Sequence, residues 1–282
     1  MAQFTNQAQL SYNNSVTNSN VAVGEILEVL SATKTAVTDQ YEQNGKVTYI
    51  VSLVNTGTTP FSGLTLSDNL GAYVFSTGTR TPLTYVDGSV KYYINGTLQT
   101  APVVTGQSPL TLSGLSVPAG GNSLIIYEAI PNQYAPLATG GTVNNQVAVS
   151  GPGITTLTAE ETVYATAEPN LSITKSISPV PVAENGTLTY TFIVQNTGNT
   201  AASAADNVVI TDTFNPVLSN LSVTFNGTTW TEGTNYTYDP TTGLFTTIAG
   251  QVTVPAATFT QNEEGIWLVN PGVSTLTVTG TV

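Results

Sequence analysis

The sequence repeats itself once, and this repeat limits the possible folds more than any other feature. Residues 30–34 match residues 171–175, so that Lys34 and Lys175 occupy equivalent places. Because the two copies are about one domain length apart, the chain is predicted to contain two homologous domains. The other matching pairs are residues 44–49 with 185–190, residues 54–57 with 195–198, residues 66–68 with 210–212, and residues 95–97 with 226–228.

Both copies consist of short segments with alternating apolar and polar residues, separated by glycine and asparagine turns. No segment keeps a helical apolar period over three turns. The sequence therefore predicts an all-β protein with two tandem immunoglobulin-like β-sandwich domains and an N-terminal donor-strand arm. The expected boundaries are 1–22 for the arm and its linker, 23–152 for domain 1, 153–168 for a linker, and 169–282 for domain 2.

Composition argues against several classes of function. The chain has no cysteine and no histidine, which argues against disulfides, thiol catalysis, histidine-based zinc sites and the common catalytic triads. Its net charge of −12 argues against nucleic acid and anionic membranes as partners. We expect no enzymatic activity other than a self-catalysed cross-linking of the chain, and we expect no cofactor or metal. The N-terminus lacks the pattern of a secretory signal.

One strand is expected to be displaced between the two copies. Domain 1 is predicted to end with a strand at 143–149, which follows a strand at 124–130. If Leu124 is aligned with Leu276, then Ile130 falls opposite Val282, and the counterpart of Asn145 would lie further on. Domain 2 is therefore expected to lack its last strand, which would leave a groove and an unpaired sheet edge.

A matching strand is expected at the N-terminus, because residues 5–11 resemble residues 144–150. Asn6 precedes Lys34 by 28 residues, and Asn145 precedes Lys175 by 30 residues. Such an arm can complete the open domain of a neighbouring subunit by β-strand addition. The alternatives are a floppy tail beside an early-ending domain, and an arm that folds back into its own domain 2. The face expected to enter the groove carries Phe4, Asn6, Ala8, Leu10 and Tyr12.

The repeated segments resemble the conserved immunoglobulin-like repeat domain of bacterial and archaeal surface proteins. That family has a lysine in its first strand, a Thr-Tyr stretch ending in Asn-Thr-Gly, a strand with Thr-Asp, and a final strand with Asn and Ala in phase. The resemblance implies an immunoglobulin-like fold and a setting on the cell surface or in an appendage. The two-domain layout also looks like that of the main ribbon proteins of clostridial spore appendages.

Three polar residues in each copy fall on faces that alternation assigns to the core. These residues are Lys34, Asp68 and Asn145 in domain 1, and Lys175 and Asp212 in domain 2 together with Asn6 of the arm. One interpretation is a buried ion pair with an asparagine hydrogen bond, and another is that the faces reach water near the strand ends. Asn144 replaces Asn145 if the register slips by one residue.

The third interpretation is a self-catalysed bond between the lysine and the asparagine. Burial favours a neutral lysine and a neutral aspartic acid, which can act as nucleophile and as proton donor. The resemblance to Gram-positive pilin and adhesin domains implies this chemistry, with Asp68 and Asp212 assisting. The expected bonds are Lys34–Asn145 within a subunit and Lys175–Asn6 between subunits.

The sequence thus favours a structural subunit of a head-to-tail extracellular fibre, with a spore-surface setting implied by the resemblance. Its partner would be another copy of itself, and no anchoring protein is indicated. The competing interpretation is a monomeric surface adhesin or ligand-binding module. No group of residues singles out a ligand site that would favour it.

Overall fold

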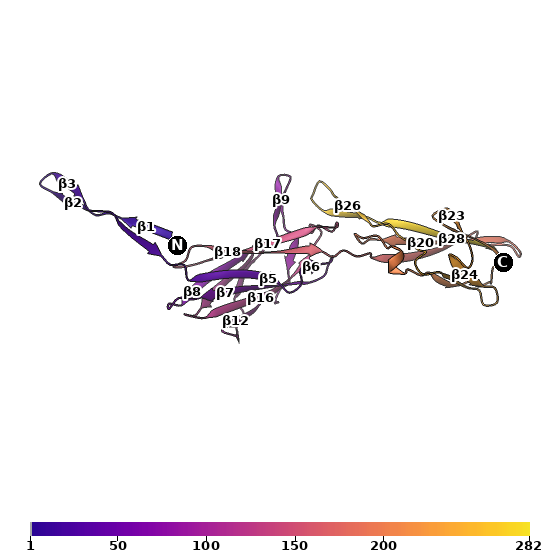
Figure 1. Cartoon of the computed structure of the whole chain (residues 1–282), viewed down its shortest axis with the longest axis horizontal. Coiled ribbons are helices and arrows are strands. Elements are labelled where there is room, and N and C mark those ends of the chain that lie inside the picture. The colour runs from indigo at the N-terminus through magenta and orange to yellow at the C-terminus, as the bar shows by residue number, and fades with distance from the viewer. Residues whose placement is uncertain (1) are drawn as a thin grey trace. The chain divides into compact units, whose positions relative to one another are not determined.

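The computed structural model describes residues 2–282, which form two compact units (Figure 1). Unit 1 comprises Met1–Ala135 and Thr142–Tyr164, and unit 2 comprises Pro136–Gly141 and Ala165–Val282. The described residues contain many strands and a single short 3-10 turn, η1 (Ala204–Asp206). The predicted all-β class is confirmed.

Unit 1 is a sandwich of two antiparallel sheets. The first sheet has the strand order β13 (Thr97–Gln99), β12 (Lys91–Ile94), β16 (Asn122–Pro131), β7 (Val47–Asn55), β5 (Leu30–Ala36), and β11 (Leu83–Tyr85) also pairs with β16. The second has the order β14 (Val103–Gln107), β15 (Leu110–Val117), β8 (Phe61–Asp68), β17 (Thr142–Ser150), β18 (Leu157–Ala165), β6 (Gln40–Tyr41). Alternate residues of β7, β15 and β16 are buried between the sheets, as a two-layer core requires.

The segment 153–168 was expected to be a linker, and this expectation is wrong for most of its length. β18 pairs with β17 along its whole length, from Thr142 opposite Tyr164 to Val149 opposite Leu157. Val163 and Ala165 of β18 are buried. Along the first half of β18, exposed residues alternate with half-buried ones in the manner of a sheet strand.

Unit 2 repeats the first sheet of unit 1 but has a shorter second layer. Its larger sheet has the order β19 (Leu171–Ser178), β20 (Thr187–Asn196), β28 (Gly272–Thr281), β22 (Ser219–Phe225), β23 (Thr228–Trp230). The other layer has the order β21 (Thr211–Thr213), β25 (Leu244–Thr247), β24 (Tyr236–Asp239), and β26 (Thr258–Gln261) pairs with β27 (Trp267–Asn270). Stacked aromatic rings, including Tyr190 on Phe214, fill the space between the layers.

Strand register corrects the alignment of the two copies by one residue. Tyr127 lies opposite Tyr49, and Val278 lies opposite Tyr190, which is the counterpart of Tyr49. The same registers match Leu124 with Thr275, whereas the sequence comparison had matched it with Leu276. The leucine match misled because Leu124 is only half-buried, whereas Leu276 is fully buried.

The Asn-Thr-Gly stretch in both copies has a structural role. The Nδ2 of Asn55 donates to the carbonyls of Thr59 and Pro118, and its Oδ1 accepts from the Gly57 amide. Asn196 makes the same set of bonds to Thr200, Pro255 and Gly198, and it also accepts from the Asn170 amide. Both asparagines are buried. Asn55 therefore ties two chain segments together, and Asn196 ties three.

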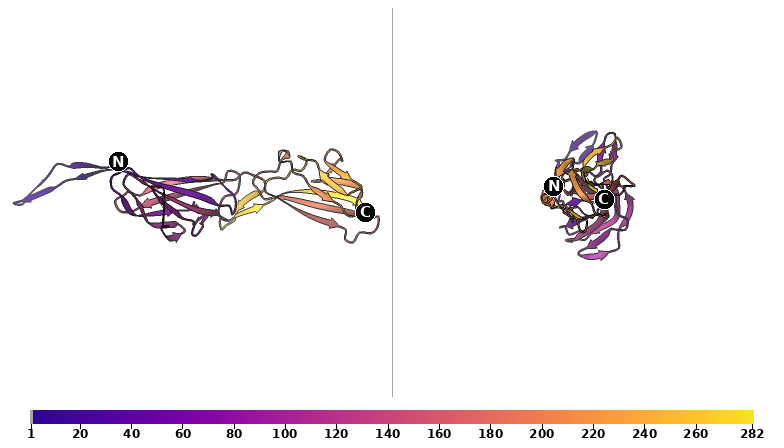
Figure 2. Two further views of the ribbon diagram at one scale, coloured as in Figure 1. Left: turned by 90° about the horizontal axis from the view of Figure 1, so that it is seen from below. Right: turned by 90° about the vertical axis from the view of Figure 1, so that its right-hand side faces the viewer.

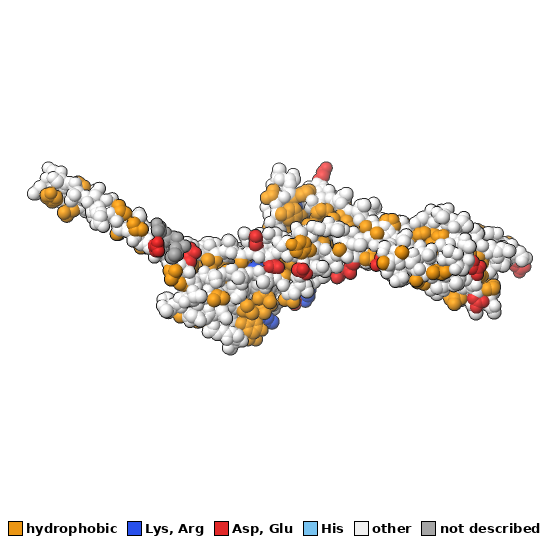
Figure 3. Space-filling model, viewed as in Figure 1, with side chains coloured by type: hydrophobic (Ala, Val, Ile, Leu, Met, Phe, Trp, Pro, Cys, Tyr) orange, Lys and Arg blue, Asp and Glu red, His pale blue; other side chains and the backbone are white. Residues whose placement is uncertain are grey.

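The N-terminal arm is a hairpin, where the sequence predicted a single free strand. β1 (Ala2–Asn6) pairs with β4 (Ala22–Ile26), and β2 (Gln9–Tyr12) pairs with β3 (Ser15–Asn18). Asn13 and Asn14 form the turn with positive φ angles of 44° and 65°, the conformation that a tight hairpin requires. Figure 2 shows the arm in indigo as a two-stranded ribbon, and Figure 3 shows apolar side chains exposed along it.

We predict that Asn196→Ala lowers the free energy of unfolding of unit 2 by about 3 kcal/mol, since several buried hydrogen bonds are lost together. Urea unfolding followed by tryptophan fluorescence measures this change, because Trp230 lies in the core of unit 2. Asn270→Ala is the matched control, because its exposed side chain makes one weak bond to Thr258. Equal effects of the two substitutions would contradict the assigned role of Asn196.

Candidate functional site

Lys34 is buried in the core of unit 1, as alternation predicted. It lies on β5 with 4% of its surface exposed, and its Nζ is 2.5 Å from Oδ2 of Asp68. Both side chains are fully shielded from solvent. The Nζ also lies 4.7 Å from the ring centre of Tyr49 and 5.9 Å from that of Tyr127, so aromatic faces surround the charge.

The Asp68 carboxylate has a hydrogen-bond donor for each oxygen. The Tyr127 hydroxyl donates to Oδ2 at 2.5 Å, and the Leu70 amide donates to Oδ1 at 2.9 Å. Asp68 ends β8, and β17 pairs alongside with Val147 opposite Asp68. This pairing brings the third predicted residue, Asn145, to the same place, because Asn145 and Val147 point to the same face of β17.

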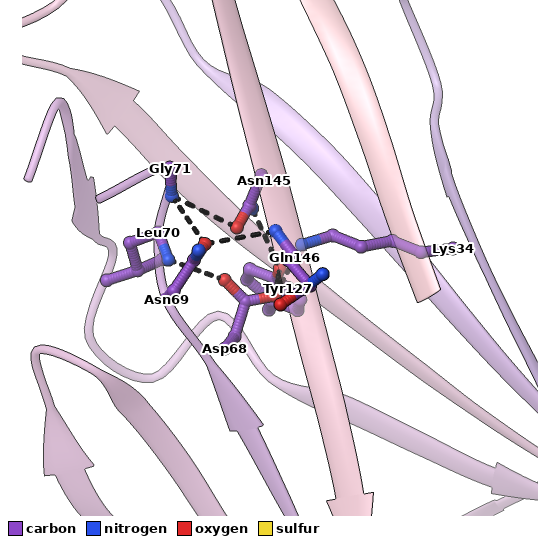
Figure 4. Close-up of polar contacts among 8 residues, drawn as sticks. All are labelled: Lys34, Asp68, Asn69, Leu70, Gly71, Tyr127, Asn145 and Gln146. Atoms are coloured by element: carbon purple, nitrogen blue, oxygen red, sulfur yellow. Dashed lines mark hydrogen bonds and ion pairs between the residues drawn. The ribbon is translucent and has the colours of Figure 1, made fainter. Parts of the chain in front are cut away.

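Asn145 is fully buried, and its carboxamide is held at both ends. Its Oδ1 accepts from the Gly71 amide at 3.2 Å, and its Nδ2 donates to the Tyr127 hydroxyl at 3.3 Å. Asn144 is exposed and donates to Glu160, so Asn145 and not Asn144 faces the site. Figure 4 shows the side chains of Lys34, Asp68, Tyr127 and Asn145 pointing toward one another.

Burial governs the electrostatics of this site. Desolvation lowers the pKa of Lys34 to about 8, although the neighbouring Asp68 charge opposes the shift. Burial raises the pKa of Tyr127 well above its usual value, so its hydroxyl keeps its proton. Burial raises the pKa of Tyr49 too. The Tyr49 hydroxyl makes no hydrogen bond of good geometry within the described structure, although Asn145 is near enough to oppose this shift.

The geometry rules out one of the three interpretations for unit 1. The strand faces do not reach water near Lys34, Asp68 or Asn145, because all three are buried. A buried ion pair fits the contacts. A neutral lysine beside a protonated aspartic acid fits them equally well, because the two states differ only in which atom of the pair holds one proton. The second state is the one that can attack a carboxamide.

Unit 2 holds the corresponding pair in a much wetter place. Lys175 forms an ion pair with Asp212 and lies 4.2 Å from the ring centre of Tyr190, but 38% of its side chain is exposed. Ile173 and Ile177, which share its face of β19, are 52% and 43% exposed. The prediction of a buried Lys175 is therefore wrong for this chain alone, because no strand within residues 2–282 covers that face.

The sheet that carries Asp212 is open on one side. In unit 1, β8 has β15 on one edge and β17 on the other. In unit 2, β21 pairs with β25, where Phe245 lies opposite Asp212 as Leu110 lies opposite Asp68. Within the described residues no strand pairs with the other edge of β21. That edge corresponds to the one that β17 and Asn145 occupy in unit 1.

The predicted arm residues are accessible. Asn6 is exposed and lies opposite Ala22 in the β1–β4 pair, and Ala8 lies in the break between β1 and β2. Phe4, Leu10 and Tyr12 are more than half exposed. The Phe4 ring lies against Gly24, where a β-carbon would collide with it.

Tyr127 and Gly71 were not among the predicted site residues. The inward position of Tyr127 could be read from the alternation of β16, because it is in phase with Ile125 and Ala129. The contact of Tyr127 with Asp68 and Asn145 could not be predicted from this alternation, because it joins three strands that are far apart in the sequence. Gly71 acts through its backbone amide, which leaves no trace in side-chain patterns.

No group of three or more potential metal-binding side chains occurs among residues 2–282. The same residues include no helix that is long and apolar enough to cross a membrane.

Comparisons with known proteins place the chain in no family. No family model and no curated protein matches it. Among solved structures, BcpA, the major pilin subunit of Bacillus cereus, matches with a TM-score of 0.36 and 9% identity over 96% of this chain and 73% of that one. The pilus backbone RrgB of Streptococcus pneumoniae matches with a TM-score of 0.35 and 11% identity over 86% and 55%. The collagen-binding subdomain of the Enterococcus faecalis surface protein ACE gives 0.31 and 8% over 50% and 99%. Likenesses this low establish neither a shared fold nor a shared function.

We predict that Lys34 titrates near pH 8 in the variant Asn145→Ala, which keeps the buried pair but removes the carboxamide. Its Nζ resonance, assigned by its loss on Lys34→Met, gives the midpoint by NMR. Because the unfolded lysine titrates at about 10.5, the unfolded state binds more protons between these values, and the stability of unit 1 should rise with pH from about 8. A Lys34 midpoint above pH 10 would contradict the desolvation argument.

Proposed function

We propose that the protein is the structural subunit of a head-to-tail extracellular fibre, in which the arm of one subunit completes unit 2 of the next. The free edge of β21 is the observation that carries this proposal, because unit 1 fills the same edge with β17. An unpaired edge beside exposed Ile173 and Ile177 is a strong association site.

The arm is built like the part that unit 2 lacks. In unit 1 that part is the β17–β18 hairpin, in which Asn145 precedes Gly153 at the tip by eight residues. In the arm, Asn6 precedes Asn14 at the tip by eight residues. Each hairpin leads into the first strand of the next sandwich. We therefore take the donor to be the whole hairpin, β1 to β4, rather than a single strand.

Apolar contact supplies the driving force for this assembly. Phe4, Leu10 and Tyr12 are exposed on the arm, as are Ile173 and Ile177 on β19. Burying a large apolar side chain contributes about 1.5–3 kcal/mol. Because donor and acceptor belong to different parts of the chain, the contact is heterologous and propagates into a fibre instead of closing a dimer.

The fibre is locked by lysine–asparagine bonds. In unit 1 the neutral Lys34 Nζ attacks Cγ of Asn145, and the Cγ–Nδ2 bond breaks. One proton passes from the attacking nitrogen to Nδ2, which leaves as ammonia. At the junction Lys175 attacks Asn6 in the same way, with Asp212 in the role of Asp68. Packing supplies the effective concentration that such a reaction needs.

The extracellular, spore-surface setting rests on the resemblance of the repeat to surface and appendage proteins. The partner is a second copy of this chain. A monomeric adhesin does not explain why a hairpin matching β17–β18 stands at the start of the chain.

Substitution Phe4→Asp is expected to stop fibre formation, because it places a charge on the arm face that enters the groove. Thr5→Asp is the matched control, since its side chain lies on the opposite face of the strand and is also exposed in the free chain. Electron microscopy of the two purified variants should show dispersed particles for the first and filaments for the second. Filaments from both variants, or from a chain without residues 2–12, would contradict arm donation.

Dispersed wild-type particles would point to the two competing arrangements. Compact monomers with a protected arm in hydrogen exchange would indicate an arm folded into its own unit 2. Monomers with a free arm that capture a ligand would indicate an adhesin.

Boiled wild-type fibres are expected to run as a ladder on a denaturing gel, because a covalent junction survives unfolding whereas a docked hairpin does not. Asn6→Ala and Lys175→Ala should each reduce the ladder to monomer, while Lys46→Ala, which removes an exposed lysine, should leave it unchanged. Monomer bands from boiled wild-type fibres would disprove the intersubunit bond but not the docking.

Within unit 1, the intact mass of the wild-type chain should be lighter than the sequence mass by one ammonia, and Lys34→Ala should restore the full mass.

A further inference from the structure

We infer that Tyr127 is a catalytic residue of the Lys34–Asn145 reaction, in which its hydroxyl relays a proton to the departing nitrogen while the Gly71 amide stabilises the oxyanion. This inference rests on the proposed bond and assigns groups that side-chain patterns did not reveal. It comes from the contacts of Asn145, which engage the two atoms of its carboxamide separately.

The Tyr127 hydroxyl lies between the acid and the leaving group. It donates to Oδ2 of Asp68 at 2.5 Å and accepts from Nδ2 of Asn145 at 3.3 Å. The same Oδ2 lies 2.5 Å from the Lys34 Nζ. A continuous path of hydrogen bonds therefore runs from the nucleophile through Asp68 and Tyr127 to the nitrogen that must leave. Because burial keeps the hydroxyl protonated, it can pass a proton on and take one up.

The proton movements along this path balance. Neutral Lys34 attacks Cγ, and the Oδ1 of Asn145 takes up negative charge. The hydroxyl of Tyr127 gives its proton to Nδ2 and receives one from protonated Asp68, and the attacking nitrogen returns a proton to Asp68. The C–N bond of the carboxamide breaks as the carbonyl re-forms. The products are one amide bond between the side chains and one ammonia, and both catalytic groups regain their starting state.

The Gly71 amide is held where the oxyanion forms. Its N–H is 3.2 Å from Oδ1 of Asn145, and the residue has a positive φ of 74°. A β-carbon at this position would lie 2.4 Å from a methyl carbon of Val143 and 3.0 Å from Pro82. Only glycine combines this backbone conformation with this close packing. A fixed backbone donor aimed at a developing oxyanion is an effective form of electrostatic catalysis.

Unit 2 offers a natural contrast, because it lacks the hydroxyl. The strand register places Val278 where unit 1 has Tyr127. The Oδ2 of Asp212 faces Lys175 and has no hydrogen-bond donor of the Tyr127 kind among residues 2–282. The relay thus belongs to the bond within unit 1.

The test uses the full chain, purified unfolded from inclusion bodies and refolded by dilution, with intact mass followed over time. Tyr127→Phe should slow the loss of ammonia by about a hundredfold, the usual contribution of a positioned proton donor. Tyr49→Phe is the matched control. Its ring stacks on Tyr127 with centres 5.6 Å apart, but its hydroxyl has no bond to Asp68, so the rate should change by less than about threefold.

Two further measurements separate catalysis from folding. In the Asn145→Ala background, where no bond can form, Tyr127→Phe should leave a folded unit 1 by NMR. In the wild type, the rate should fall as pH rises above about 8, because the Lys34–Asp68 pair then loses the one proton that the relay uses. Glu161 and the two tyrosines also face Lys34, and neither tyrosine releases its proton there.

Equal rates for wild type and Tyr127→Phe would overturn the relay while leaving the bond established. A rate that rises through pH 8 would also overturn it, since a lysine acting without the acid gains reactivity as it is deprotonated. A wild-type chain that folds but never loses ammonia would overturn the bond itself, and the relay with it.

Discussion

The structure of unit 1 is arranged around a lysine side chain that has been removed from water. Burying a charge costs several kcal/mol unless partners offset the loss of hydration. Here Asp68 supplies the opposite charge, Tyr127 and Leu70 satisfy the remaining carboxylate sites, and two aromatic rings enclose the nitrogen. Each partner comes from a different strand or loop, so the folded sandwich is what holds them together.

The two units show what this arrangement requires. Both have the lysine and the aspartate at matching positions, and both place an aromatic ring near the lysine. What differs is the strand beyond β8 or β21, which closes the site in unit 1 and is lacking among the described residues of unit 2. Closure by that strand therefore turns a half-exposed ion pair into a buried one. In the proposed fibre, the pair of unit 2 would stay open to water until a partner arrives.

Much of this could be predicted from the sequence, because strand alternation reports directly on which face is buried. The inward positions of Lys34, Asp68 and Asn145 followed from that rule, and the structure brings all three together. Alternation does not report which strands become neighbours, so the contact of Tyr127 with Asn145 could not be foreseen. It also cannot distinguish a free strand from one half of a hairpin, and for this reason the pairing of β1 with β4 was missed. The one-residue error at Leu124 arose because Leu124 and Leu276 are the same residue type but differ in burial.

The positions of Lys34 and Asn145 have a mechanical consequence. Lys34 is on β5, the first strand of the sandwich, and Asn145 is on β17, which only β18 follows in unit 1. About 110 residues therefore lie between them. Fully extended, that length of chain would span roughly 370 Å. If these two side chains are joined in the proposed fibre, tension would pass through the bond and bypass the intervening strands, and the chain between them could not be pulled out. A subunit under tension would then keep nearly its folded length, whereas a sandwich without the bond would lengthen as its strands unfold.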